Sequence, residues 1–328
     1  MRITILAGGV GGARFTSAVR EHLRDLEAAG GEASEITVVV NTGDDMWLSG
    51  LKVCPDLDSL TYALGGVNDA ERGWGRAGES ERVSAELTAF GVGWPWFTLG
   101  DLDLATHIAR SSMLRDGLTL SEATVRITAR WPLGVRLIPM SDQDVETHVE
   151  VEFPGEGVRL LHFEEWWVRL RASAPARRFV QKGVESARPA PGVLEAITDT
   201  DAVLIAPSNP VVSIGTILGV PGIADAVRST AAPVVGVSPV IGGAVVRGMA
   251  DACLAAIGVE TSAEAVGRHY GTRSEDGLLD AWLVGEEDAE AVPALAAAGL
   301  RARSVPLWLN ERDASVRLAA DALAAARG

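Results

Sequence analysis

The feature that most constrains this chain is a glycine-rich turn between a short apolar strand and a helical segment. Residues 3–6 form the apolar run, Ala-Gly-Gly-Val-Gly-Gly-Ala-Arg follows at 7–14, and residues 16–26 have helical periodicity. A strand, a glycine turn and a helix start together direct backbone N–H groups at an anion, because no Cβ blocks its approach. The candidate phosphate-binding residues are Gly8, Gly9, Gly11, Gly12 and Arg14.

This turn matches neither common nucleotide-binding template. A Walker loop needs Gly-Lys-Ser/Thr, but the only lysines are Lys52 and Lys182. The dinucleotide pattern Gly-x-Gly-x-x-Gly, started at Gly9, ends on Arg14 instead of glycine. The turn therefore indicates a phosphate without indicating NAD or an ordinary nucleoside triphosphatase. A tight β–α turn with close helix packing is the alternative interpretation.

Short β-branched runs alternate with helical segments along most of the chain. Strands are expected at 3–6, 36–40, 202–206, 233–237, 281–284 and 303–307. This alternation predicts an α/β fold, with a Rossmann-like parallel sheet that has helices on both faces. Residues 148–153 and 158–163 flank Pro-Gly-Glu-Gly and indicate a β-hairpin. We predict a Rossmann-like domain at 1–110 and 190–328, with an inserted α+β subdomain at 110–190 that contains the hairpin.

Composition excludes several classes of partner. The formal net charge is −15, whereas duplex nucleic acid needs a basic surface. No apolar run approaches the roughly 20 residues of a membrane span, and the short N-terminal apolar stretch lacks a signal-peptide cleavage region. Cys54 and Cys253 are too few for a disulfide framework or a cysteine zinc site. We expect a cytoplasmic protein with no membrane or nucleic-acid partner.

Polar residues gather where the expected strands end, the edge at which open parallel sheets bind ligands. Asp44 and Asp45 follow the second strand, and Asp56 and Asp58 come shortly afterwards. Because an acidic chain that binds phosphate needs a local cation, these carboxylates on loops favour Mg²⁺. The alternative for each aspartate taken singly is a turn or helix-capping residue that faces water. After a later strand, Ser208, Asn209 and Ser213 are candidates to bind phosphate or a base, although Asn209 and Ser213 also suit helix capping.

A third dense stretch lies at 96–107. It predicts a helix that starts at Asp101 as N-cap, with Asp103 and His107 four residues apart on one face and Arg110 next along it. These side chains are candidates to position a substrate, and His107 to transfer a proton. An acidic first turn that favours the helix dipole, with His107 as a structural hydrogen-bond partner, is the alternative that we prefer for the histidine.

Six stretches together resemble one family. They are Ala-Gly-Gly-Val-Gly-Gly-Ala-Arg at 7–14, Asn-Thr-Gly-Asp-Asp at 41–45, Cys-Pro-Asp-Leu-Asp at 54–58, Leu-Gly-Asp-Leu-Asp-Leu-Ala-Thr-His at 99–107, Ala-Pro-Ser-Asn-Pro-Val-Val-Ser-Ile-Gly at 206–215 and Ser-Pro-Val-Ile-Gly-Gly at 238–243. Their order and spacing resemble the 2-phospho-L-lactate transferase family of coenzyme F-420 biosynthesis. Residues 247–251 and 266–271 resemble its actinobacterial branch, the phosphoenolpyruvate transferases.

The resemblance implies a Mg²⁺-dependent transferase, usually a homodimer, with a Rossmann-like fold and an inserted subdomain. Its donor is a guanosine diphosphate diester that carries enolpyruvate, or lactate in the archaeal branch. Its acceptor is the deazaflavin Fo (7,8-didemethyl-8-hydroxy-5-deazariboflavin). The terminal ribityl hydroxyl of Fo attacks the distal phosphorus, GMP leaves, and dehydro coenzyme F-420-0 remains.

The resemblance also implies residue roles. Asp45 and Asp58 hold the metal or the Fo hydroxyl, and Asp58 orients that hydroxyl or accepts its proton. The glycine turn with Arg14 binds phosphate, while the group Ser208, Asn209 and Ser213 holds the nucleotide or the carboxylate. Asp101 and Asp103 line the Fo side, where this chain has Leu102 and the family often has arginine. A nucleotide-sugar-binding regulator of the same fold is the alternative function, and a dehydrogenase is a weaker third one.

Overall fold

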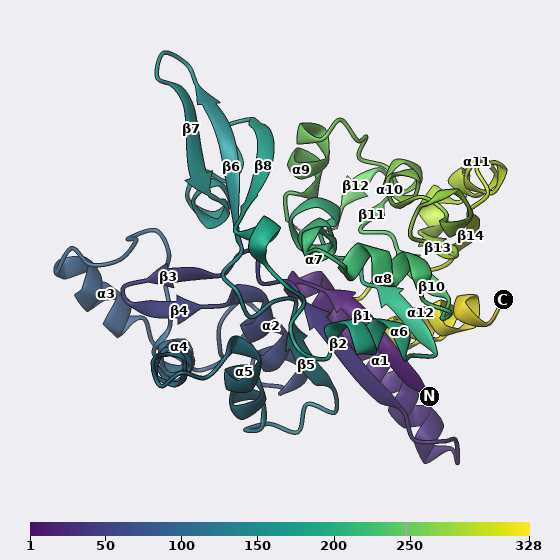
Figure 1. The fold of residues 1–328 in the computed structure, drawn as a ribbon, viewed down its shortest axis with the longest axis horizontal. Coiled ribbons are helices and arrows are strands. Elements are labelled where there is room, and N and C mark those ends of the chain that lie inside the picture. The colour runs from purple at the N-terminus through teal and green to yellow at the C-terminus, as the bar shows by residue number, and fades with distance from the viewer. Residues whose placement is uncertain (247) are drawn as a thin grey trace.

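The computed structural model describes residues 1–246 and 248–328, so Arg247 of the 247–251 motif lies outside the described residues. Seven parallel strands form the main sheet, in the spatial order β5-β2-β1-β9-β10-β13-β14 (Figure 1). Their bounds are β1 Arg2–Ala7, β2 Glu35–Val40, β5 Arg136–Pro139, β9 Ala202–Ile205, β10 Val234–Val237, β13 Ala281–Val284 and β14 Arg301–Ser304. The expected strands are all present, with end shifts of one to a few residues.

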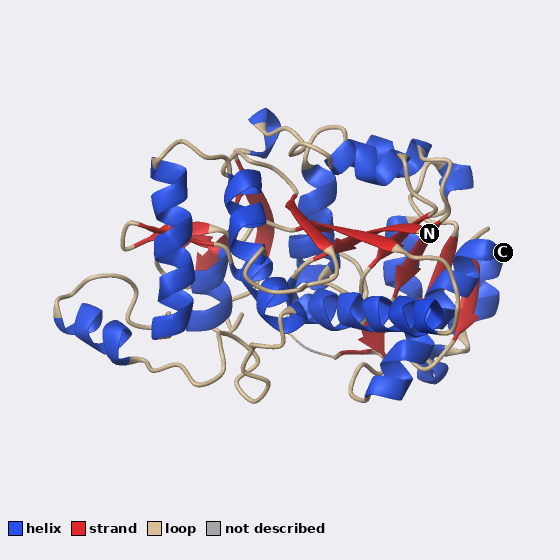
Figure 2. Cartoon of the chain, turned by 90° about the horizontal axis from the view of Figure 1, so that it is seen from below, coloured by secondary structure: helices blue, strands red, loops and turns tan. Residues whose placement is uncertain are grey.

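Helices cover both faces of this sheet, because successive side chains of a strand point to opposite sides (Figure 2). On β1, Ile3 and Ile5 pack into one core and Leu6 into the other. The first core includes α1 Gly9–Ala28, α2 Pro55–Leu64 and α12 Arg312–Arg327. The second includes α6 Val193–Thr198, α7 Gly215–Gly219, α8 Ile223–Ser229, α10 Ala263–Tyr270 and α11 Ala291–Ala297. The predicted Rossmann-like α/β class is confirmed.

The order of the sheet determines where a ligand site belongs. From β1 the chain adds β2 and β5 on one side, and then β9, β10, β13 and β14 on the other. The direction of growth therefore reverses between β1 and β9, which pair in parallel. In doubly wound sheets, a crevice opens beyond the carboxyl ends of the strands at this point. The glycine turn follows β1 and the 206–215 segment follows β9, so both lie at the reversal.

A second, antiparallel sheet projects from the main body at the top of Figure 1. It consists of β6 Glu146–Phe153, β7 Gly157–His162 and β8 Ala176–Lys182, and β6 with β7 is the predicted hairpin. Trp166, in a π-helical turn after β7, is fully buried in the small core of this sheet. Strand β5 falls within 110–190 but is the edge of the main sheet, and the domain division at 110 and 190 stays a prediction.

A short hairpin and four helices, α2 to α5, lie between β2 and β5 along the chain. The short hairpin β3 Met46–Leu48 and β4 Leu51–Val53 follows β2, and α3 Arg82–Ala89, α4 Asp101–Arg115 and α5 Leu120–Thr128 come next. Helix α4 begins at Asp101, as predicted, but its N-cap is Gly100. Asp101 instead accepts hydrogen bonds from Ser80 N and Oγ at 2.9 and 2.8 Å. Asp56 and Asp58, predicted on a loop, lie in the first turn of α2, which begins at Pro55.

The stretch 244–257 does not form a single helix. It contains β12 Ala244–Val245, paired with β11 Val240–Ile241, and then α9 Ala250–Ala256. Gly248 has a φ of +86°, which an α-helix does not accommodate. Among the described residues, no single helix is long and apolar enough to cross a membrane. The helical segments 210–219 and 223–229 reach the required length and apolar composition only when taken together, and they are bent by 89° where they meet.

Candidate functional site

The glycine turn after β1 packs directly against the segment after β9. Ser208 Oγ accepts a hydrogen bond from Gly8 N at 3.0 Å and donates one to Gly8 O at 2.7 Å. A Cβ on Gly11 would lie 2.7 Å from the Pro207 carbonyl oxygen, and one on Gly12 would lie 2.8 Å from Ser208 Oγ. The glycines therefore permit this close packing, as the alternative interpretation of the turn expected, whether or not the turn also binds phosphate.

An internal carboxylate lies at the start of α1. Asp56 accepts a hydrogen bond from the Gly9 backbone, and a Cβ on Gly8 would lie 2.5 Å from Asp56 Oδ2. Asn41 Nδ2 donates to Asp56 Oδ2 at 2.9 Å and to Asp44 Oδ2 at 3.2 Å. Burial raises the pKa of Asp56 to about 6, against the opposing hydrogen bonds from Asn41 and Gly9. The turns after β1 and β2 and the start of α2 thus converge.

Two more buried carboxyl groups join this side of the site. Burial, assisted by the charge of Asp56, raises the pKa of Glu164 to about 8. The pKa of Asp44 is also raised, first by burial and then by Asp56 and Glu164, and its Oδ1 has no hydrogen-bond partner in the described chain. We name Asp44, Asp56 and Glu164 the upper carboxylate group. Its electrostatics favour protonation or a nearby cation.

A second group, which we name the lower carboxylate group, consists of Asp45, Asp58 and Asp103 with the cations beside them. Arg110 forms a two-pronged pair with Asp58 through Nη1, at 3.1 Å, and Nη2. Lys52 Nζ lies 3.9 Å from Asp45 Oδ2 and 2.5 Å from Asp144 Oδ1. Burial raises the pKa of Asp45 to about 7, against opposing effects from Lys52, the Cys54 thiol and Arg110. Neither Asp45 oxygen makes a hydrogen bond to the described residues.

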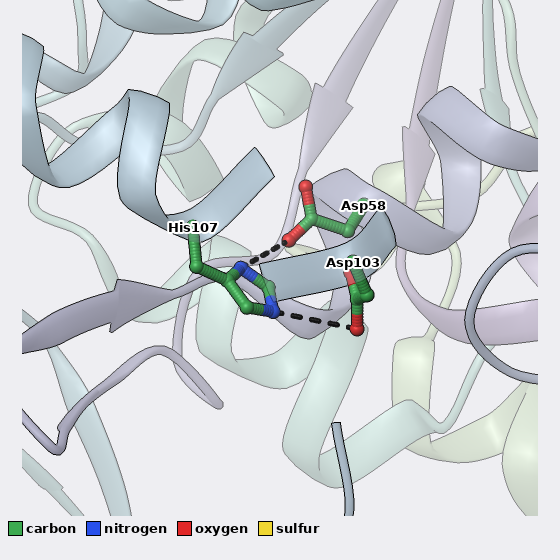
Figure 3. Close-up of side chains that lie close together, drawn as sticks. All are labelled: Asp58, Asp103 and His107. Atoms are coloured by element: carbon green, nitrogen blue, oxygen red, sulfur yellow. Dashed lines mark ion pairs between the residues drawn. The ribbon is translucent and has the colours of Figure 1, made fainter. Parts of the chain in front are cut away.

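His107 lies between Asp58 and Asp103 (Figure 3). Its Nδ1 is 3.5 Å from Asp58 Oδ2 and lies 3.3 Å from Arg110 Nη1 in a hydrogen-bond contact. Its Nε2 is 3.3 Å from Asp103 Oδ2, close enough for an ion pair, but makes no hydrogen bond within the described residues. Tyr62 donates a 2.7 Å hydrogen bond to Asp103 Oδ1. Asp58, Asp103 and His107 each offer a ligand atom within 4.8 Å of the others, so they also form a candidate cation-binding set. His107 is fully buried, in keeping with the structural role preferred from the sequence.

Other candidate residues are engaged elsewhere. Asn209 Oδ1 accepts hydrogen bonds from Val211 N and Val212 N, and so caps the π-helical turn 210–214. Ser213 is buried, and its Cβ would be 2.9 Å from a Cβ placed on Gly8. Arg14 is exposed on α1, and Asp101 bonds to Ser80. These contacts do not assign ligands, so the binding roles of these residues stay predictions.

Sequence reasoning missed two members of the site. Glu164, after the second strand of the projecting hairpin, comes from a region that we set apart as an insertion, and no local pattern marks it. Lys52 did carry a signal, because it is one of only two lysines in an acidic chain and lies between the motifs at 41–45 and 54–58.

A cavity of about 180 Å³ with both apolar and polar lining opens between α3, α4 and the β3–β4 hairpin. Leu104 of α4, one residue after Asp103, lines it together with Leu48 and Leu51 of the β3–β4 hairpin. Trp94 and Phe97 line another wall, and Trp94 stacks on Trp96 with ring centroids 4.7 Å apart. The cavity therefore presents aromatic as well as aliphatic surface.

The order of the strands defines a Rossmann-like α/β protein. Its glycine turn lies at the reversal point of the sheet, with buried carboxylates beyond it, and this combination suits an anion together with a cation. The family model for 2-phospho-L-lactate transferase CofD matches residues 3–317. The chain belongs to this family of transferases, as the resemblance of its motifs predicted.

Curated relatives match along nearly the whole chain. The chain is 56% identical over 323 residues to the phosphoenolpyruvate transferase of Streptomyces coelicolor, which covers 98% of this chain and 97% of that protein. It is 55% identical over 323 residues to the protein of the same name from Thermobifida fusca, with the same two shares covered. For the Nocardia farcinica protein of that name, the identity is 52% over 325 residues, covering 98% and 94%.

A solved structure confirms the fold. A member of the UPF0052 family from Bacillus halodurans superposes with a TM-score of 0.61 at 18% identity, covering 98% of this chain and 99% of that one. At this identity the similarity supports the fold and carries no statement about activity.

Proposed function

We propose that this transferase moves the phosphoenolpyruvate moiety of enolpyruvyl-2-diphospho-5'-guanosine to the deazaflavin Fo, in the biosynthesis of coenzyme F-420. The observation that carries the proposal is the pair of unpartnered Asp45 oxygens, buried beyond the carboxyl end of β2 and beside Lys52 and Asp58. A buried carboxylate without hydrogen bonds is costly unless a ligand or cation completes it. The names of the curated relatives support this choice of transferred group.

The residues present fit a bound Mg²⁺. Mg²⁺ prefers oxygen ligands and is commonly held by one or two carboxylates together with substrate phosphates. Asp45 has two free oxygens, and Asp58 keeps lone pairs beyond those that Arg110 uses. Asp45 and Asp58 would therefore hold the ion, which would neutralise charge on the diphosphate and on the departing GMP.

The chain's own residues then orient the two substrates. Asp58, held by its two-pronged pair with Arg110, positions the terminal ribityl hydroxyl of Fo or accepts its proton. The hydroxyl oxygen forms a bond to the distal phosphorus as the bond from that phosphorus to the GMP oxygen breaks. Asp101, Asp103 and the cavity at Trp94 belong to the Fo side in this proposal. The glycine turn with Ser208, Asn209 and Ser213 belongs to the nucleotide side, and the assembly is a homodimer.

The test is an activity measurement with purified protein, Fo, enolpyruvyl-2-diphospho-5'-guanosine and Mg²⁺, in which GMP release and the mass of the deazaflavin product are followed. We expect one GMP per Fo converted, and a smaller rate with the lactyl or glyceryl donor. Absence of GMP release from folded protein contradicts the proposed function.

Asp45→Asn tests the residue that carries the proposal. The substitution keeps the shape of the side chain and removes an uncompensated buried charge, so the fold is retained while turnover falls about 100-fold or more. Asp116→Asn, at an exposed position that ends α4, is the matched control and keeps wild-type turnover. Wild-type turnover in Asp45→Asn would contradict the role assigned to Asp45. The proposed reaction would then be judged by GMP release from the wild-type protein alone.

A further inference from the structure

We propose that Lys52 binds the distal phosphate of the donor, and that Asp144 is the counter-ion that Lys52 releases when the donor arrives. The inference rests on the proposed function for the identity of the donor. It assigns a phosphate contact to a residue outside the glycine turn and outside the carboxylates expected to hold the metal.

The ammonium of Lys52 is buried but only partly used. Its side chain is 4% exposed, and Nζ makes one hydrogen bond within the described chain, to Asp144 Oδ1 at 2.5 Å. An ammonium has three N–H donors, so two remain. Asp45 Oδ2, at 3.9 Å, is too distant for a hydrogen bond, and both Asp45 oxygens are themselves unpartnered. A ligand oxygen beside Nζ would use a spare donor of Lys52.

The backbone of Lys52 is fixed on both sides. Its N–H donates to Ser111 Oγ at 2.7 Å, and its carbonyl accepts from Arg110 Nη1 at 3.2 Å. Both partners lie on α4, the helix that carries Asp103 and His107. Trp47 lies near the other side of the side chain, with its ring centroid 6.0 Å from Nζ. The position of the lysine is therefore set before any ligand arrives, which lowers the entropy cost of binding.

Asp144 differs from Lys52 in its surroundings. It lies in the turn between β5 and β6, and its side chain is 61% exposed. An exposed carboxylate regains water when it leaves a cation, so the cost of breaking this ion pair falls mainly on the buried ammonium, which an incoming phosphate would compensate. A diphosphate offers more negative charge to the same ammonium. Exchange of Asp144 for a phosphate oxygen is therefore inexpensive on the carboxylate side.

Arg110 is less available for the same task. Its two terminal nitrogens already contact Asp58, and Nη1 also donates to the Lys52 carbonyl. Arg110 Nε has no partner, but the carboxylate that Arg110 holds, Asp58, is buried, whereas the carboxylate hydrogen-bonded to Lys52, Asp144, is exposed and can be exchanged. This asymmetry points to the lysine rather than the arginine as the phosphate contact.

The test measures GDP binding by calorimetry, because the β-phosphate of GDP stands for the distal phosphate of the donor. Lys52→Met removes the charge and keeps the buried stem, so binding weakens about tenfold or more, the range of one charge-assisted hydrogen bond. Asp144→Asn removes the competing anion, so binding tightens several-fold. Lys182→Met, at the exposed second lysine, is the matched control and binds GDP as the wild type does.

The opposite signs separate a phosphate contact from a merely structural ion pair, for which both substitutions would weaken binding together. That result, or wild-type affinity in folded Lys52→Met, overturns the inference. If circular dichroism shows that Lys52→Met does not fold, Lys52→Arg replaces it. We expect Lys52→Arg to bind GDP within a few-fold of the wild-type affinity. The inference then stands or falls with the tighter GDP binding expected for Asp144→Asn. If Asp144→Asn binds GDP more tightly but the wild-type protein releases no GMP in the activity assay, the phosphate contact of Lys52 is supported and only the proposed transferase function is contradicted. No GDP binding by wild-type protein overturns the inference, and GMP release then judges the function alone.

Discussion

Removing Arg110 should destabilise the fold more than removing any surface cation. Its side chain is 2% exposed and pairs with Asp58, which is 6% exposed. Loss of one partner from a buried pair leaves a desolvated charge and costs about 3–5 kcal/mol. Arg110→Met also loses the hydrogen bond to the Lys52 carbonyl, worth about 1 kcal/mol. The expected loss is therefore about 4–6 kcal/mol, a large part of the 5–15 kcal/mol typical of a folded domain.

The double variant Asp58→Asn with Arg110→Met isolates the cause. It removes the charge that the single substitution leaves behind, so it should be more stable than Arg110→Met alone. Urea unfolding of the three proteins, followed by far-ultraviolet circular dichroism at pH 7 with EDTA present, measures both differences. An Arg110→Met midpoint equal to wild type, or a double variant less stable than the single one, refutes the reasoning.

Two further substitutions test the upper carboxylate group and the glycine turn. Because the pKa of Glu164 is raised to about 8, the folded protein holds a proton that the unfolded chain releases near pH 4.3, and stability falls as pH rises between these values. Glu164→Gln should therefore gain stability over wild type between pH 5 and pH 8, and a melting-temperature difference independent of pH would contradict this. Gly11→Ala should lose about 1–3 kcal/mol, because its Cβ would lie 2.7 Å from the Pro207 oxygen, and unchanged thermal stability would show that the turn can relax.

Much of the fold was accessible from the sequence because its signals are local. The strand at 36–40 is a β-branched run, and the helix at 101–115 follows from periodicity and an acidic first turn. The glycine turn was placed correctly for the same reason. The start of α2 was missed although Pro55 is a common first residue of a helix, because the aspartates around it suggested a turn.

The site was less accessible because its contacts join distant segments. Arg110 and Asp58 are 52 residues apart, and Lys52 and Asp144 are 92 apart. The positions of Asp45 and Asp58 in the sequence predicted that both lie at the same edge of the sheet. The sequence did not show that Arg110 pairs with Asp58, or that the Asp45 oxygens have no hydrogen-bond partner in the described residues. Such information depends on the packing of α4 against β4, which no local pattern encodes.

The Asp56 carboxylate at the start of α1 makes entry to that helix end selective. The first amide groups of a helix attract any anion, from chloride to sulfate. Here the Asp56 carboxylate lies at the helix start. An anion without a counter-ion is therefore repelled, whereas a helix end without such a carboxylate would attract it. A phosphate that arrives together with its own divalent counter-charge avoids this repulsion. Under the proposed function, the charge of Asp56 would therefore favour a diphosphate that carries a divalent cation over a simple anion.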